Sequence, residues 1–366
     1  MVSDMNILII NPIPYTSETE HIKRAGSIKD TMIYGLASAF VREGHNVTLF
    51  MAESYKITGE EDYPFKVIWA PCKLARIFKV HRIPYMPELS KYIRQNIDQI
   101  DMIISGEIFA LHTLAAVRLG KGKTIIWHEL AKHNNLMHKI PSKIWYNIIA
   151  RICMRNTLVI GRSEAAKEFA SRYCHNVSET VIGHGIDLGK FAFCGEKEDY
   201  FVVVSQLIAR KRIDGIIRAF SEYGNKSLSK LVIIGDGDKR KELEELAGSL
   251  SISDRVVFTG KLGHDKMLPY LQHAKAMLIN TEKDNSMISI IESIACGTPV
   301  VSTPVPLNTP EIIEGSLGII AEKISSKQLA DIDRDNSSYV ENCRLYRDKL
   351  SNEAKVREFI KVFTNR

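Results

Sequence analysis

Short apolar runs alternate with longer amphipathic stretches along most of the chain. Alternation of this kind predicts βα units and parallel sheets. In the first half, we expect a helix at residues 31–43 and strands at 6–10, 47–51, 65–70, 102–105, 124–127, 157–160 and 180–182. In the second half, we expect strands at 200–205, 230–234, 256–259, 276–280 and 300–303. The helices expected there lie at 213–223, 240–248, 266–273, 289–296 and 352–363.

The chain has 366 residues, which is more than one hydrophobic core usually contains and indicates two domains. We therefore predict an α/β protein with two Rossmann-like, doubly wound parallel-sheet domains that face each other across a cleft. The first covers residues 1–190 and the second 191–350, with a linker at 191–199; residues 351–366 form a C-terminal helix expected to pack back on the first domain. Ligands of such sheets bind beyond the carboxyl ends of the strands, so the chemistry is expected in the loops there.

Composition narrows the class of protein. Hydrophobic residues make up 45% and charged residues 25% of the chain, so an ordered globular protein is expected. No apolar run is long enough to span a bilayer, and the N-terminus lacks the basic start and apolar core of a signal peptide. The six cysteines form no C-x-x-C pair, which disfavours a zinc or redox motif and fits a reducing compartment. We therefore expect a cytoplasmic protein.

The net charge of +6 lies in the first half, because residues 1–190 hold 24 Lys and Arg against 18 Asp and Glu. A basic surface favours an anionic membrane or an acidic acceptor, although a solvated basic face explains the charge equally well. Residues 143–155 combine basic residues with Ile and Trp at helical spacing. This stretch could lie on the inner face of the cytoplasmic membrane, or pack on its own sheet with a basic outer face.

The segment most informative about function is 284–300, which follows the expected strand 276–280. Its polar loop comes directly before a helix, so several backbone N–H groups lack helical partners and can bind a diphosphate. The residues expected in this role are Asn285, Ser286, Met287 and Ile288. Asp284 and Glu292 lie eight residues apart and offer carboxylates to hydroxyl groups of one ligand.

This segment resembles the donor-binding motif of glycosyltransferase family 4, whose members have the two-Rossmann GT-B fold. The family pattern is a Glu, seven residues, a second Glu and then Ala-x-Ala-x-Gly-x-Pro-Val. It is matched here at Glu292, Ala295, Gly297, Pro299 and Val300. Asp284 stands at the first Glu and is one methylene shorter. The resemblance implies that Asp284 contacts the donor sugar and Glu292 the ribose.

Three further loops of the second half resemble the same family. In 205–214, Lys211 matches the Lys that binds the donor diphosphate, whereas Gln206 stands where an Arg is expected. Arg210 or Arg212 could supply the missing charge. The turn at 233–237 resembles the family's Gly-Asp-Gly turn and adds Gly235 to the donor site. The strand end at 256–260 resembles the base-binding strand end and adds Thr259, Gly260 and Lys261.

In the first half, residues 124–129 resemble the family's strand-ending His-Asp, which assigns His128 to the sugar or the acceptor. Residues 160–164 and 182–187 resemble family motifs near the cleft. The Gly-Gly that the family usually has in its first loop is absent. Gly26 and Ser27 lie near that position and are expected to help bind the acceptor.

The resemblance implies a retaining hexosyltransferase that moves a sugar from a nucleoside diphosphate sugar to a hydroxyl of a glycan acceptor. His128, Lys211, Asp284 and Glu292 are the expected catalytic residues. No metal or other cofactor is expected, because Lys and Arg can stabilise the leaving diphosphate, and neither D-x-D sequence, at 236–238 or 333–335, has a context that suits a metal. The expected acceptor is a lipid-linked oligosaccharide or an intermediate of lipopolysaccharide, O-antigen or capsule. Nucleic acid is not an expected partner.

Two alternatives stay open from the sequence. A nucleotide-sugar epimerase on the same fold would consume the donor without an acceptor. A non-catalytic protein would bind a sugar nucleotide within an assembly and show no turnover. The departures from the family pattern at Gln206 and Asp284 keep the second alternative open.

Overall fold

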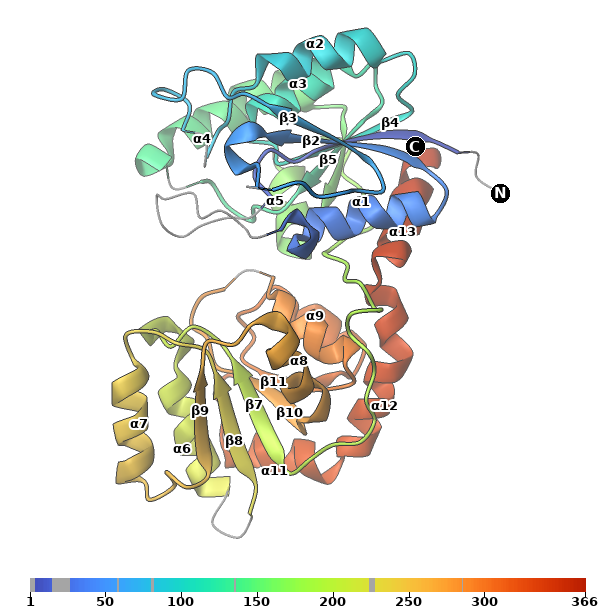
Figure 1. Ribbon diagram of the computed structural model, residues 1–366. Coiled ribbons are helices and arrows are strands. Elements are labelled where there is room, and N and C mark those ends of the chain that lie inside the picture. Colours follow the sequence, from blue (N-terminus) through green and yellow to red (C-terminus); the bar gives the residue numbers. More distant parts are fainter. Residues whose placement is uncertain are drawn as a thin grey trace. The chain divides into compact units, whose positions relative to one another are not determined.

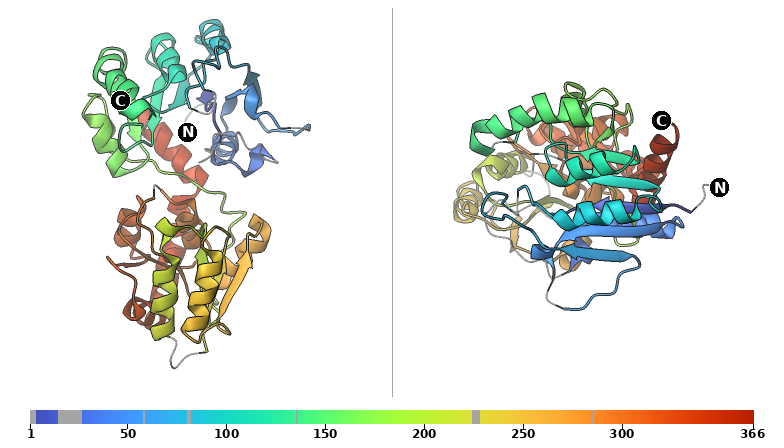
Figure 2. Two further views of the ribbon diagram at one scale, coloured as in Figure 1. Left: turned by 90° about the vertical axis from the view of Figure 1, so that its left-hand side faces the viewer. Right: turned by 90° about the horizontal axis from the view of Figure 1, so that it is seen from above.

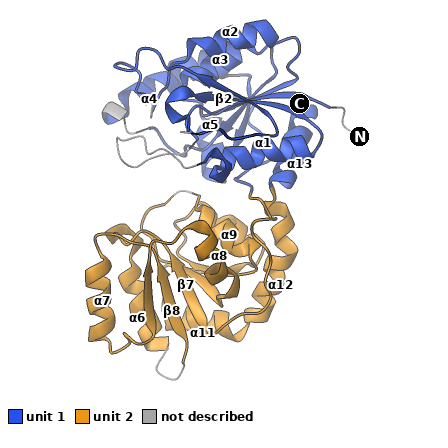
Figure 3. Ribbon diagram, in the orientation of Figure 1, with its two compact units in different colours: residues 1–185, 352–366 blue, residues 186–351 orange. Residues whose placement is uncertain are grey.

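The computed structural model describes residues 4–14, 27–57, 59–79, 82–134, 136–223, 228–284 and 286–366. The chain divides into two compact units (Figure 3): unit 1 comprises residues 1–185 and 352–366, and unit 2 comprises residues 186–351. Each unit contains a six-stranded parallel sheet with helices packed against it (Figures 1 and 2). The predicted pair of doubly wound α/β domains is confirmed.

The sheet of unit 1 has the strand order β3-β2-β1-β4-β5-β6. Its strands are β1 (Asn6–Ile10), β2 (Asn46–Ala52), β3 (Lys66–Ala70), β4 (Met102–Gly106), β5 (Thr124–His128) and β6 (Leu158–Gly161). This order is the doubly wound one, in which the direction of winding reverses between β1 and β4. The central strands are apolar on both sides because helices cover both faces.

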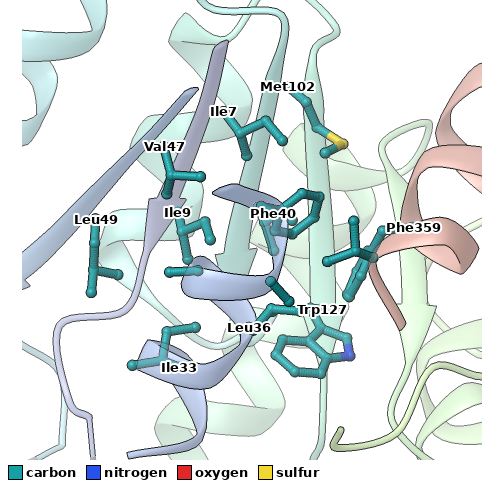
Figure 4. Close-up of a cluster of buried hydrophobic side chains, with 14 of the residues drawn as sticks. Ile7, Ile9, Ile33, Leu36, Phe40, Val47, Leu49, Met102, Trp127 and Phe359 are labelled. Carbon is teal, nitrogen blue, oxygen red and sulfur yellow. The ribbon is translucent and has the colours of Figure 1, made fainter. Parts of the chain in front are cut away.

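Helices of unit 1 pack on both faces of this sheet. They are α1 (Met32–Arg42), α2 (Pro87–Asn96), α3 (Leu111–Leu119), α4 (Ile140–Ile144), η4 (Trp145–Met154), α5 (Glu164–Ser171) and α13 (Asn352–Thr364). The last of these, α13, lies beside α1 (Figure 1). Figure 4 shows how Phe359 of α13 joins Phe40 of α1 and Trp127 of β5 in one buried cluster. Each such aromatic side chain contributes about 1.5–3 kcal/mol on burial, so α13 is part of the core of unit 1.

Unit 2 repeats the same winding with the order β12-β11-β10-β7-β8-β9. Its strands are β7 (Tyr200–Val204), β8 (Lys230–Ile234), β9 (Val256–Gly260), β10 (Ala276–Ile279), β11 (Val300–Ser302) and β12 (Gly318–Ile320). One face is covered by α6 (Ile213–Tyr223), α7 (Arg240–Ser249) and α11 (Ser326–Arg334). The other is covered by α8 (His264–His273), α9 (Ile288–Ala295), α10 (Thr309–Glu314) and α12 (Asn336–Tyr346). Helices α6 and α9, which follow the neighbouring strands β7 and β10, therefore lie on opposite faces.

Several elements differ from the sequence predictions, among them helices α2, α3, α5, α10, α11 and α12, which were not predicted. Residues 180–182, expected to be a strand, form no ladder: the Ile182 N–H donates to the carbonyl of Gly161, and its own carbonyl accepts from the Trp127 indole. The segment is apolar because Ile182 is buried, and not because it belongs to the sheet. The three-residue strand β12 was not predicted, since so short a run carries almost no periodicity.

Candidate active site

The candidate donor site lies where the winding of unit 2 reverses. Strands β7 and β10 are hydrogen-bonded neighbours, and the chain leaves them toward opposite faces of the sheet. Such a reversal leaves a crevice at the carboxyl ends of the two strands, which is where open α/β sheets bind ligands. The crevice is lined by Ser205, Lys211, Asn280, Thr281 and Met287. Two of the loops that carry sequence-predicted donor residues, those after β7 and β10, thus meet at this crevice.

The Gly-Asp-Gly turn after β8 is hydrogen-bonded to the loop after β7 through the backbone. The N–H of Leu207 donates to the carbonyl of Asp236, and the N–H of Lys239 donates to the carbonyl of Leu207. A Cβ on Gly235 would lie 1.8 Å from the carbonyl oxygen of Ser205, and Gly235 has a φ of +143°. Only glycine permits this close backbone approach. In this structure the turn therefore supports the cationic loop.

The cations of this loop converge on one carboxylate. The ammonium of Lys211 contacts Oδ2 of Asp284, and Nη1 of Arg210 lies 3.4 Å from the same oxygen. The hydroxyl of Thr281 donates to it as well, at 3.1 Å. Arg210 thus joins Lys211, whereas Arg212 pairs outward with the exposed Glu282 at 2.6 Å. Of the two arginines that the sequence left open, Arg210 is the one whose guanidinium shares the Asp284 carboxylate with Lys211.

The side chain of Gln206, at the position of the family's Arg, is exposed. The next residue of the backbone, Leu207, is joined to the turn at residues 235–237, since its N–H donates to the carbonyl of Asp236. The positive charge near β7 is therefore supplied by Arg210 and Lys211, which come four and five residues later in the 3-10 turn η5 (Ala209–Lys211).

The start of α9 offers backbone donors, although one of them is occupied. The N–H of Met287 donates to Oδ1 of Asn308 at 2.6 Å. Ser286 and Ile288 flank it, with Ile288 in the first turn, where an α-helix leaves N–H groups without helical acceptors. Asn285 lies outside the described residues. Asn308 was missed by sequence reasoning, because its role depends on a contact across 21 positions.

Glu292 lies one turn into α9 and is largely buried, with 14% of its side chain exposed. Burial raises the pKa of its carboxyl to about 7. Nε2 of His264, at the start of α8, lies 3.4 Å from Oε1 of Glu292. The His264 ring in turn packs edge-on against Phe191, with the ring centroids 5.2 Å apart. His264 was not predicted, and its exposed position gave no signal in the sequence.

The predicted base-binding strand end is joined to the Gly-Asp-Gly turn. The N–H of Gly235 donates to the carbonyl of Gly260, which has a φ of +73°. The Thr259 hydroxyl donates to the same carbonyl at 2.9 Å. Lys261 follows and is exposed. Backbone groups at this end of β9 are therefore positioned by β8, while the assignment of the base to these residues stays a prediction.

Unit 1 carries a polar group of its own at the carboxyl ends of β4, β5 and β6. Nδ1 of His128 lies 2.9 Å from Oε2 of Glu107, which has a φ of +68°, and the N–H of Glu129 donates to Oε1 of Glu107 at 3.0 Å. Burial alone would raise the pKa of Glu107, but His128 and Arg162 hold this pKa below its usual range. Glu107 was missed by sequence reasoning.

The His128 ring itself is fully buried, stacked near Phe169 with centroids 6.1 Å apart. Glu107, by contrast, keeps 28% of its side chain exposed. Contact between His128 and a sugar therefore stays a prediction, and it requires the ring or its cover to move. Sequence matching placed His128 at the strand end without revealing on which side of the sheet its ring is packed.

Arg162 completes this group. Its guanidinium donates to Glu129 at 2.9 Å and lies over the Trp127 ring, 3.8 Å from the centroid. Burial, with the charge of Arg162, lowers the pKa of His184 to about 3, so that ring is neutral. A fixed cation thus sits beside the Glu107 and Glu129 carboxylates.

The two residues predicted for the acceptor are placed only in part. Gly26 lies outside the described residues. Ser27 caps the 3-10 turn η1 (Ile28–Asp30), where its Oγ accepts from the N–H of Lys29 at 2.9 Å. This capping bond accounts for Ser27 in the present structure, and its part in acceptor binding stays a prediction.

Within the part of the chain that the structure describes, no group of three or more His, Cys, Asp or Glu side chains could hold a metal ion. None of the described helices has both the length and the apolar character needed to cross a membrane.

Comparison with known proteins gives two family models that match adjoining parts of the chain. "Glycosyltransferase Family 4" matches residues 30–190, and "Glycosyl transferases group 1" matches residues 191–356. The alpha-monoglucosyldiacylglycerol synthase of Streptococcus pneumoniae is 25% identical over 302 residues, which are 74% of this chain and 67% of that protein. Five other curated relatives match over shorter segments, which span 27% to 35% of their own lengths.

Solved structures share the fold over nearly the whole chain. The Anabaena protein HepE, in complex with UDP and glucose, has a TM-score of 0.65 at 16% identity, over 99% of this chain and 100% of that one. The lipopolysaccharide outer core galactosyltransferase WaaB has a TM-score of 0.65 at 13% identity, over 99% of both chains. At such identities the likeness shows the fold alone. Together with the two family models, it shows that the chain belongs to glycosyltransferase family 4 and has the GT-B fold of two Rossmann-like domains.

Proposed function

We propose that this glycosyltransferase is a retaining, metal-independent hexosyltransferase that moves a sugar from a nucleoside diphosphate sugar to a hydroxyl of a glycan acceptor. The observation that carries the proposal is the convergence of Arg210, Lys211 and the start of α9 at the carboxyl ends of β7 and β10. Two cations and a helix start at a topological switch point suit a nucleoside diphosphate. The shared fold of HepE, which binds UDP and glucose, supports the same ligand class.

In this proposal the acceptor hydroxyl attacks the anomeric carbon on the face from which the diphosphate leaves. The bond between the anomeric carbon and the phosphate oxygen breaks, and the leaving phosphate takes the hydroxyl proton. Lys211 and Arg210 stabilise the charge that develops on the diphosphate. A divalent metal has this role in other transferases. Glu292 holds the ribose, and backbone groups at residues 259–261 meet the base.

The first unit is proposed to bind the acceptor, with Glu107, Glu129 and Arg162 as the polar groups near it. Carboxylates and a guanidinium at the ends of parallel strands can accept and donate hydrogen bonds to several sugar hydroxyls at once. Positioning of this kind accounts for a large part of the rate gain in transfer reactions. We place the reaction in the synthesis of bacterial surface polysaccharide, that is lipopolysaccharide, O-antigen or capsule.

The exposed surface of the helix formed by α4 and η4 suits a membrane, and this supports a lipid-linked acceptor. Every fourth side chain of α4 and η4 is buried, namely Ser142, Tyr146, Ala150 and Met154. One neighbouring stripe consists of isoleucines that are 50% to 75% exposed, Ile140, Ile144, Ile148 and Ile152. The stripe beside it carries Lys143, Asn147, Arg151 and Arg155, all exposed. The sequence has no Asp or Glu between Glu129 and Glu164, so this face suits an anionic bilayer surface.

The packing interpretation and the membrane interpretation of this helix are compatible, because they concern different stripes of it. Its inner stripe packs within unit 1, with Tyr146, Ala150 and Met154 in a core shared with Val159 and Phe169. Its outer stripes remain for a surface. We therefore propose a cytoplasmic protein held at the inner face of the cytoplasmic membrane by this helix.

The proposal is tested by offering the purified protein a panel of nucleoside diphosphate sugars, each with EDTA and with Mg²⁺. Thermal stabilisation and nucleotide release are recorded first without an acceptor and then with lipid-linked glycans. One donor should raise the melting temperature, be hydrolysed slowly and be transferred, equally well in EDTA. A donor that is consumed into an epimer would favour an epimerase. Binding of no donor, or binding only with Mg²⁺, would overturn the proposed site.

A further inference from the structure

The carboxylate of Asp284 forms ion pairs with the cations that are proposed to bind a diphosphate. Oδ2 of Asp284 is contacted by Lys211, Arg210 and the hydroxyl of Thr281. These groups are mostly shielded from water, because the exposed fractions of the side chains are 16% for Asp284, 10% for Lys211 and 30% for Arg210. An ion pair screened so little by solvent is stronger than a surface pair.

We infer that Asp284 is the counter-ion that a diphosphate must displace from Lys211, and that it thereby lowers the affinity of the site for a nucleotide that carries no sugar. The inference rests on the proposed function, which assigns the diphosphate to Lys211. Asp284 already neutralises much of the charge of this ammonium, so a second anion that approaches Lys211 is repelled by the nearby carboxylate. The Asp284 carboxylate therefore lowers the affinity of this site for a diphosphate.

The two ligands of the reaction differ in what they offer the displaced carboxylate. A nucleoside diphosphate sugar brings hydroxyl groups, which can donate hydrogen bonds to Asp284 and replace the lost ion pair. A free nucleoside diphosphate has only its ribose hydroxyls, which the proposed function assigns to Glu292, and it leaves the Asp284 carboxylate beside a second negative charge. Asp284 therefore disfavours the product more than the substrate. The consequence for turnover is faster release of the nucleotide after the sugar has been transferred.

The loop offers a matched control for the charge. Glu282, two residues before Asp284, pairs with Arg212 at 2.6 Å, and its side chain is 58% exposed. Glu282→Gln removes one negative charge from the same loop without touching Lys211. A general electrostatic effect of the loop would appear in both variants, whereas the counter-ion effect would appear only in Asp284→Asn.

The test is isothermal titration of wild-type protein, Asp284→Asn and Glu282→Gln with UDP, GDP, ADP, the matching glucose nucleotides and inorganic pyrophosphate, all in EDTA. Asp284→Asn should bind the preferred nucleoside diphosphate and pyrophosphate at least fivefold more tightly than wild type. Its affinity for the sugar nucleotide should gain less, or fall. Glu282→Gln should stay within twofold of wild type. The gain should shrink at 0.5 M salt, since a charge effect is screened.

The inference is overturned if Asp284→Asn binds the nucleoside diphosphate and pyrophosphate no more tightly than Glu282→Gln does. Failure of the proposed function has a different signature: no nucleotide binds to any of the three proteins, while the pyrophosphate titrations still report on the counter-ion. Thermal unfolding is measured for each variant. If Asp284→Asn is not folded, Asp284→Ser, which also removes the charge, replaces it in the same titrations.

Discussion

Nδ1 of His128 lies 2.9 Å from a carboxylate oxygen of Glu107, at the ends of the neighbouring strands β5 and β4. A carboxylate in this place favours the tautomer with the proton on Nδ1 and leaves Nε2 to accept or donate a proton elsewhere. Among the described residues, no hydrogen-bond partner reaches Nε2, and the approach of Nδ1 to Oε2 of Glu107 is a close electrostatic contact without hydrogen-bond geometry. The pair therefore joins a buried imidazole to a partly exposed carboxylate.

If this pair helps to position the acceptor, Glu107→Gln should lower kcat/KM by about 10-fold or more, and His128→Ala by about 100-fold, because positioning contributes much of the rate gain in transfer. The melting temperature of Glu107→Gln is measured alongside. Glu168→Gln, an exposed change within α5, serves as the control. Normal turnover by a stable Glu107→Gln variant would leave the pair with a purely structural role.

Lys211→Ala should weaken binding of the donor about 10- to 100-fold, because a hydrogen bond to a charged group contributes about 1.5–3 kcal/mol. The loss also leaves Asp284 less well neutralised, which repels the diphosphate further. The control is Lys239→Ala, which removes a cation paired with Glu242 on the surface of the same unit. This variant should bind the donor as tightly as the wild type does. Titration calorimetry compares the three proteins, and equal affinities would place the diphosphate elsewhere.

Glu292 should make the stability of unit 2 depend on pH. Its pKa is about 7 in the folded protein, against 4.5 for an ordinary Glu. The folded state thus binds the proton more tightly, so stability falls as pH rises from about 4.5 to 7 and then levels off. At about 1.4 kcal/mol per unit of pKa, the loss amounts to roughly 3 kcal/mol.

The amide of Glu292→Gln cannot ionise. Between pH 5 and pH 8, the wild type should therefore lose about 2–3 kcal/mol more stability than this variant. Urea unfolding followed by circular dichroism at both pH values measures the difference, and all other titrating groups cancel in the comparison. Parallel pH profiles for the two proteins would show that Glu292 ionises at its ordinary pKa.

Gly235→Ala should damage the donor loop. The added methyl would lie 1.8 Å from the carbonyl oxygen of Ser205, at a φ of +143°, so the loop after β7 must shift. We expect a loss of about 2–4 kcal/mol in stability, together with weaker donor binding. Gly263→Ala is the matched control, since nothing lies within 4 Å of its added Cβ. Thermal unfolding of both variants decides between a local clash and a general effect of losing glycine.

The exposed isoleucines of η4 should govern membrane binding. Ile148→Ser combined with Ile152→Ser should reduce sedimentation with phosphatidylglycerol vesicles at least tenfold, because both methyl-rich side chains leave the bilayer surface. Ile313→Ser combined with Leu345→Ser removes two exposed apolar residues of unit 2 and should have no effect. Vesicles of phosphatidylcholine alone should bind the wild type weakly. Equal sedimentation of both double variants would contradict a docking role for η4.

The periodicity of the sequence was sufficient for most of the fold. Strong runs such as Lys230–Ile234 and amphipathic helices such as Ile213–Tyr223 were predicted at the bounds that the structure has. The errors fall on helices that were not assigned, such as α2 and α12. They also fall on segments whose apolar residues are buried without a ladder, as at residues 180–182, or whose strands are too short for a period, as in β12.

The pairing of side chains within the candidate site could not be predicted. Matching to a family motif selected Lys211 and Asp284 separately, but their contact joins loops 73 positions apart. The contact between Glu107 and His128 depends on a left-handed backbone conformation at Glu107, directly after β4. No local sequence pattern indicates this conformation for a glutamate. Asn308 and His264 likewise act through the packing of loops that lie near each other only in the folded chain.

The return of α13 to unit 1 makes unit 2 an uninterrupted insertion in the chain of unit 1. The two ends of the interruption are close together, since a Cβ on Gly185 would lie 2.9 Å from the Cα of Asn352. A gene in which a short glycine-serine linker joins these two residues would encode unit 1 as one continuous polypeptide with Phe359 still in its core. Cutting the chain at the end of unit 2 instead would remove that phenylalanine, so the two halves of this enzyme are separable by excision and not by truncation.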